Sequence, residues 1–156
     1  MALHHTLNNI GATLSVVGHT ADEAGPKGYP PGALAAGTYT DGDPFSIEGA
    51  RSLILTAMTG AATGSPTAQS HSFALETAPA GTASDGAEWT AYAGASVALT
   101  GDEKAARKDV SLGLLPAGHR IARVKVTVAF TGGSSPKQSV SSQVVLGGYE
   151  VLPAPQ

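Results

Sequence analysis

Histidine is the side chain of this sequence best suited to hold a metal ion or to transfer a proton near neutral pH. The five histidines are His4, His5, His19, His71 and His119. None belongs to the His-Glu-x-x-His pattern of a zinc protease, and no cysteine is present to complete another zinc site. Glycine motifs that cradle phosphates are missing as well. The sequence therefore predicts neither a metal site nor a bound cofactor.

The acidic residues form two groups that resemble known sites only in part. The run Asp41-Gly42-Asp43 matches the opening of a calcium-binding loop, but the glycine and the final glutamate of the complete pattern are absent. Glu76, Asp85 and Glu88 are close in sequence and suggest the paired acids of a glycoside hydrolase. Acidic residues beside a hairpin are far more often solvated turn residues. We interpret both groups as turns.

Serine is plentiful, but a hydrolase of the α/β type needs its serine in a Gly-x-Ser-x-Gly elbow between a strand and a helix. The sequence contains no such elbow, and its run Gly132-Gly133-Ser134-Ser135-Pro136 lies in a loop that no helix follows. We therefore predict no catalytic residues and no enzymatic activity.

Charge and hydropathy exclude further classes of function. Charged residues make up 13% of the chain and the net charge is −3, so direct nucleic-acid binding is not expected. No window is long and apolar enough to cross a bilayer, and residues 1–6 lack the basic and apolar regions of a secretory signal. The absence of cysteine is compatible with assembly in a reducing cytoplasm. We expect a soluble protein without a membrane partner.

The elements that must position these residues are strands. With 42% hydrophobic residues but only 5% aromatics, and with 20 glycines and 10 prolines, the chain favours thin, turn-rich layers. Alternation of apolar and polar residues is clearest over residues 121–130 and recurs over 138–146. Residues 51–58 and 70–77 show it too, with His71 on the apolar face of the second run. Residues 101–108 suit a single helical turn or a charged loop.

An internal echo supports a layered fold. Gly64-Ser65-Pro66 and Ser134-Ser135-Pro136 each stand between two expected strands. Two similar hairpins of this kind suit the two layers of a sandwich or jelly roll. The sequence thus predicts an all-β fold, an antiparallel β-sandwich or jelly roll, over residues 45–152, followed by a short tail at 153–156.

Residues 1–44 differ from this domain, because their short apolar patches are separated by glycines and by a Pro/Gly-rich run at 25–32. Proline removes backbone donors and glycine adds chain entropy, so the stretch suits neither a helix nor a central strand. We expect an extended N-terminal arm; the alternative is an unstructured terminus. The residues that would anchor the arm on a neighbouring subunit are Leu7, Ile10, Leu14, Val16, Val17, Tyr29, Leu34 and Tyr39.

Trp89 and Tyr92 leave a carbohydrate-binding alternative open, since aromatic rings on a β-sandwich can stack on sugars. A spacing of three along a strand places them on opposite faces, however, so one ring belongs to the core. A single ring then remains for a sugar, which weakens this alternative.

Two segments resemble small virion proteins of tailed bacteriophages. The first runs from Thr63-Gly64-Ser65-Pro66-Thr67 through Phe73-Ala74-Leu75-Glu76 to Ser84-Asp85-Gly86-Ala87-Glu88-Trp89. The second runs from Arg120-Ile121-Ala122-Arg123-Val124-Lys125-Val126 through Gly132-Gly133-Ser134-Ser135-Pro136 to Leu146-Gly147-Gly148-Tyr149. The similarity covers about residues 51–152 and does not include the arm.

This resemblance implies a β-sandwich or jelly-roll subunit of the particle, such as a capsid decoration (cement) protein on the exterior of the head. Such proteins clamp neighbouring capsomers, often as trimers, and have no catalytic residues to transfer. The expected partners are the major capsid protein and further copies of the chain. The alternatives are a sugar-binding module on the particle surface and a structural component of the neck or tail.

Overall fold

The computed structural model describes residues 15–19, 33–40 and 44–148, and for residues 15–19 it describes the backbone alone. Every regular element in these ranges is a strand. The strands are β1 (Ser15–His19), β2 (Ala33–Leu34), β3 (Gly37–Tyr39), β4 (Phe45–Ser46), β5 (Ser52–Thr63), β6 (Ala68–Pro79), β7 (Thr90–Thr100), β8 (Ala105–Ser111), β9 (His119–Thr131) and β10 (Lys137–Gly147).

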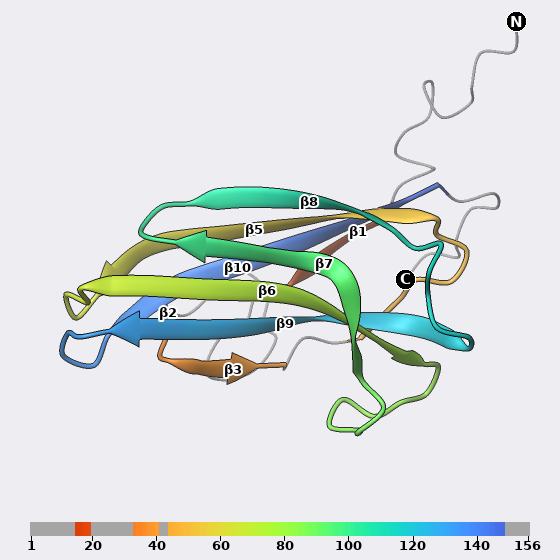
Figure 1. Ribbon diagram of the computed structural model, residues 1–156, viewed down its shortest axis with the longest axis horizontal. Coiled ribbons are helices and arrows are strands. Elements are labelled where there is room, and N and C mark those ends of the chain that lie inside the picture. Colours follow the sequence, from red (N-terminus) through yellow and green to blue (C-terminus); the bar gives the residue numbers. More distant parts are fainter. Residues whose placement is uncertain (1–14, 20–32, 41–43, 149–156) are drawn as a thin grey trace, which may run out of the picture.

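The strands form two antiparallel sheets that pack face to face (Figure 1). Sheet A has the order β1-β10-β5-β8, and β2 also pairs with β10. Sheet B has the order β3-β9-β6-β7, and β4 also pairs with β9. The expected all-β sandwich is therefore confirmed.

The strand order answers a question that the sequence left open, namely whether the sandwich is a jelly roll or has an immunoglobulin-like order. Along the chain from β2 to β10, leaving β4 aside, the first strand pairs with the last, β2 with β10. The nesting continues inward with β3 on β9, β5 on β8 and β6 on β7. A ribbon of nested antiparallel pairs folded over into two sheets is a jelly roll.

Four connections lead from one sheet to the other at the same end of the sandwich. Residues 35–36, 64–67, 101–104 and 132–136 make these crossings, and we call this end the arch end (Figure 1). The two Ser-Pro loops are therefore arches between sheets, and the expected pair of hairpins is wrong. The reason is that each strand pairs with one that is distant in sequence, β5 with β10 and β6 with β9.

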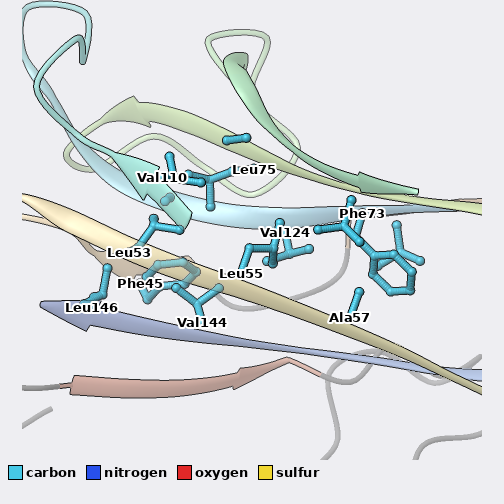
Figure 2. Packing of buried hydrophobic residues seen from close by; sticks show 14 of the residues in the cluster. Phe45, Leu53, Leu55, Ala57, Phe73, Leu75, Val110, Val124, Val144 and Leu146 are labelled. Atoms are coloured by element: carbon cyan, nitrogen blue, oxygen red, sulfur yellow. The ribbon is translucent and has the colours of Figure 1, made fainter. Parts of the chain in front are cut away.

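The core lies between the sheets and follows the predicted alternation (Figure 2). In β9, Val124, Val126 and Val128 are at most 2% exposed, whereas Lys125 and Thr127 between them are only partly buried on the outer face. The largest fully buried hydrophobic side chains of the core are Leu34, Ile47, Leu53, Leu55, Phe73, Leu75 and Leu146.

The sandwich begins earlier in the chain than the expected boundary at residue 45. Leu34 is fully buried in the core, and Tyr39 packs against it with its hydroxyl donating to the Ala35 carbonyl at 3.0 Å. Residues 33–40 thus form short edge strands and not an arm. Very short strands at a sheet edge tolerate the glycine-rich composition that argued against a strand here.

The segment 101–108, for which the sequence predicts a helical turn or a charged loop, contains an arch and the start of β8. β8 is the edge strand of sheet A and pairs with β5 alone in the described chain. Its charged residues Arg107, Lys108 and Asp109 obscured the strand pattern. Charges on an edge strand discourage pairing with other chains, which accounts for them.

Candidate functional site

The outer face of sheet B carries a buried ionic cluster, made of Glu76, Arg123, Lys125 and Trp89. The Glu76 carboxylate accepts from Arg123 Nε at 2.9 Å and from Lys125 Nζ at 2.6 Å, and Arg123 Nη2 lies 2.7 Å from the same carboxylate. Glu76 is 5% exposed and Arg123 7%. One buried carboxylate is therefore paired with two cations, the buried Arg123 and the partly exposed Lys125.

Electrostatics within this cluster favour the charged carboxylate. Burial by itself would raise the pKa of Glu76, but the hydrogen bonds and positive charges of Lys125 and Arg123 outweigh it and hold the pKa below its usual range. Glu76 is accordingly ionised at neutral pH and is not a general acid.

Trp89 closes the cluster from the side of the β6–β7 loop. The guanidinium carbon of Arg123 lies 4.3 Å from the centre of the Trp89 ring, a cation–π contact. The indole N–H donates to the Ala83 carbonyl at 2.8 Å, and Arg123 also donates to the Ser84 carbonyl. The cluster thus pins the loop of residues 80–89 against sheet B.

The two aromatic rings proposed for a sugar platform do not form one. Trp89 is 9% exposed under Arg123 on the outer face, whereas Tyr92 packs against the core between the sheets. The Tyr92 hydroxyl donates to the Ser111 carbonyl at 2.7 Å. The rings lie on opposite sides of sheet B, as their spacing predicts, and each is engaged in holding the fold.

A second polar cluster lies at the arch end and includes His71, Gln138 and Asp102. The Gln138 amide nitrogen lies near three acceptors, the Gly60 carbonyl at 2.6 Å, the Asp102 carboxylate at 3.2 Å and the Gly101 carbonyl at 3.4 Å. Its amide oxygen therefore faces His71, whose Nε2 donates to it at 2.5 Å. His71 Nδ1 is buried and has no hydrogen-bond partner in the described structure.

This arch-end network supports structure rather than chemistry. His71 is 1% exposed and Gln138 is fully buried, so neither side chain is open to a substrate. Asp102 also accepts from the Ala62 amide at 3.0 Å and from Gln69 Nε2 at 2.5 Å, which ties the 101–104 arch to β5 and β6.

The remaining pair with a catalytic appearance is Thr77 and His119. The Thr77 hydroxyl lies 2.9 Å from His119 Nδ1. Thr77 is fully buried, however, so its oxygen is not placed to attack a substrate. No group of three or more histidine, aspartate or glutamate side chains that could hold a metal ion occurs in the described ranges.

The predicted partner-binding residues divide into three sets. Leu34 and Tyr39 belong to the sandwich, as described above. Val16 and Val17 lie in β1, where their backbone pairs with Val145 and Val144 of β10. The others lie outside the described residues, as does the Asp-Gly-Asp run at 41–43; they are Leu7, Ile10, Leu14 and Tyr29.

Sequence reasoning missed the partners that organise both clusters, Arg123 and Gln138. Arg123 stands at a polar position of an alternating strand, where an ordinary solvent-facing residue is expected. Gln138 is the second residue of β10 and carries no signal of burial. The contacts of both residues reach across 47 and 67 positions of the chain, to Glu76 and His71.

No family model and no curated protein matches the sequence. Within the described residues there is no helix with the length and hydropathy needed to cross a membrane.

Proposed function

We propose that this chain is a non-enzymatic structural protein of a tailed-phage particle, a capsid decoration (cement) protein that binds the outside of the head. Its partners in this proposal are the major capsid protein and further copies of itself, with a trimer favoured. The observation that carries the proposal is the jelly-roll strand order, because jelly rolls are a recurrent architecture of viral capsid proteins. The sequence resemblance to small virion proteins points the same way.

The use made of the reactive side chains supports a structural role. The buried carboxylate of Glu76 is paired with Arg123 and Lys125, and the buried imidazole of His71 hydrogen-bonds to Gln138. Both groups therefore stabilise the sandwich, and neither faces solvent in a position to act on a substrate.

In this proposal the N-terminal segment reinforces the capsid mechanically. Packaged DNA loads a capsid from within, and a subunit that spans two capsomers adds stabilising contact area without any chemistry. β1 pairs with β10 and is an edge strand of sheet A. The segments that precede and follow β1 are therefore connected to the sandwich at this edge. Apolar anchors such as Leu7 and Ile10 would let this segment order on a neighbouring subunit, which loses entropy but covers a large surface.

A sugar-binding module of the particle is the second candidate, because lectins share the jelly-roll architecture. Trp89 and Tyr92 are both engaged in contacts within the fold, which favours the decoration protein over the sugar-binding module. A glycan array probed with the wild-type chain and with Trp89→Ala tests this candidate. Specific binding that the substitution abolishes would favour the sugar-binding module over the decoration protein.

The decisive experiment is a count of copies per particle, by quantitative mass spectrometry of purified virions of the phage that encodes the chain. A decoration protein is expected at a copy number of the same order as the major capsid protein. A copy number no larger than one ring of subunits at the neck or tail would indicate a neck or tail component. Absence of the protein from the virion would overturn the proposal. Heads made without the protein should regain thermal stability when it is added back.

A further inference from the structure

The loop between β8 and β9 exposes an apolar surface that the fold does not use. Residues 113–118 read Gly-Leu-Leu-Pro-Ala-Gly and contain no polar side chain. Leu114 is 88% exposed, whereas the other exposed large hydrophobic of the described chain, Met58, is 41% exposed. Single exposed leucines are ordinary, but here Pro116 and Ala117 of the same loop are exposed too.

The loop is held in one conformation by several hydrogen bonds. Two successive turns are closed by Leu115 N donating to the Leu112 carbonyl at 3.3 Å and by His119 N donating to the Pro116 carbonyl at 3.1 Å. The Tyr92 hydroxyl accepts from the Leu114 amide at 3.3 Å while it donates to the Ser111 carbonyl. A side chain presented by a rigid loop loses little entropy on binding, which favours its use as an anchor.

The position of the loop indicates which end of the sandwich faces a partner. In sheet A, Ser15, Leu146, Leu53 and Val110 stand side by side in one row across β1, β10, β5 and β8. The chain therefore enters β1, leaves β10 and enters the Leu114 loop at the same end, opposite the arches (Figure 1). We call it the terminal end. The segments 1–14 and 149–156 both attach there.

We infer that Leu114 is a docking knob, which inserts into an apolar pocket of the protein shell on which the chain sits. This inference rests on the proposed function and adds the contact that seats the sandwich, distinct from the N-terminal anchors. A large apolar side chain that becomes fully buried is typical of the central contact of a protein interface.

Charge near the loop favours a protein over a lipid surface as the partner. Arg120, which follows the loop, is paired with Glu48, so it does not add to a basic ring. Loops and helices that insert into anionic membranes carry an excess of lysine and arginine beside their apolar residues. An apolar tip whose following arginine is already paired fits a pocket in another protein better than an anionic membrane.

The test compares Leu114→Ser with the matched variant Met58→Ser, which makes a similar change at the other exposed hydrophobic, on β5. The full-length proteins are titrated onto purified heads that lack the decoration protein, and bound copies are counted. We expect Leu114→Ser to weaken binding by about tenfold or more, the loss that follows when a buried leucine is truncated, and Met58→Ser to bind as wild type does.

The outcomes separate the inference from the proposed function. If the wild-type chain does not bind heads, the proposed function fails. If the wild-type chain binds and Leu114→Ser binds equally well, or both variants weaken alike, the docking knob is overturned while decoration stands. A photoreactive amino acid at position 114 should crosslink to the shell protein. A crosslink to a second copy of the chain instead would also overturn the inference.

Discussion

The two ends of the sandwich are built in opposite ways. At the arch end the loops interlock: Ser134 N donates to the Gly64 carbonyl at 2.8 Å, and a Cβ added at Gly133 would lie 2.6 Å from that same carbonyl. At the terminal end, Leu115 packs against the core, whereas its neighbour Leu114 is 88% exposed. Polar and backbone groups at the arch end form hydrogen bonds with one another, whereas the terminal end exposes an apolar side chain to solvent. The comparison shows that the arch end is closed by contacts within the fold, whereas the terminal end leaves a large apolar side chain exposed.

Gly64→Ala should lower the free energy of unfolding more than any other substitution considered, because the added methyl group disrupts the contact between the two arches. Gly64 has φ +74°, and a Cβ there would lie 2.4 Å from the Ser134 carbonyl oxygen and 2.8 Å from Pro136 Cα. Backbone strain and overpacking together predict a loss of about 4 kcal/mol in the free energy of unfolding, measured by denaturant titration.

The control for this prediction is Gly81→Ala in the β6–β7 loop. Gly81 has φ +83°, but a Cβ there meets nothing within 4 Å, so only the backbone strain of about 1 kcal/mol applies. Equal losses for both variants would show that the close approach of the two arches is unimportant.

Arg123→Met should have the next largest effect. It leaves Glu76 buried with Lys125 as its remaining cation and removes the contact with Trp89, which predicts a loss of about 3 kcal/mol. Arg120→Met removes a pair whose side chains are 55% and 61% exposed, and should change stability by about 0.5 kcal/mol or less. Thermal unfolding of the two variants side by side measures the difference in stability. A similar change in melting temperature for both variants would contradict the burial of the Arg123–Glu76 pair.

Acidification should weaken the ionic cluster in a defined direction. Because the pKa of Glu76 is lowered in the folded protein, its contribution to stability is complete above the unfolded-state value of about 4.3 and is lost as the pH falls through the folded value. Glu76→Gln should flatten this part of the curve of unfolding free energy against pH. A wild-type curve that is already flat below pH 4 would contradict the lowered pKa.

Leu114→Ser should have the smallest effect on stability. The side chain is 88% exposed and contributes little to the core, so the free energy of unfolding should change by less than about 0.5 kcal/mol. A large loss in chemical denaturation would mean that the loop belongs to the folding core, and the contrast between the two ends would then disappear.

Much of the layering could be predicted from local pattern. Residues that alternate along a strand must face opposite sides of a sheet, so Val124, Val126 and Val128 pointed to a core before any partner was known. The same local signal failed for β8, where charges at an edge masked a strand. It also failed for Leu34, which was assigned to an arm because glycine and proline surround it.

The candidate sites were less predictable, for a different reason. Trp89 and Glu76 were noticed as individual residues, but their roles depend on Arg123, which reaches Glu76 across 47 positions of the chain. His71 was placed on the apolar face of its strand, whereas its partner Gln138 lies 67 positions away. No local pattern encodes such pairings.

The sequence by itself determined that this protein is all-β, that its sheets have one apolar face, and that it lacks the common catalytic and metal-binding motifs. These properties follow from residue type and from a period of two. Only the tertiary structure decided that the Ser-Pro loops are arches, that the strands nest as a jelly roll, and that Arg123 lies over the Trp89 ring while Leu114 stays exposed. These features depend on which distant strands pair and in which register, and pairing is settled by the packing of the whole domain.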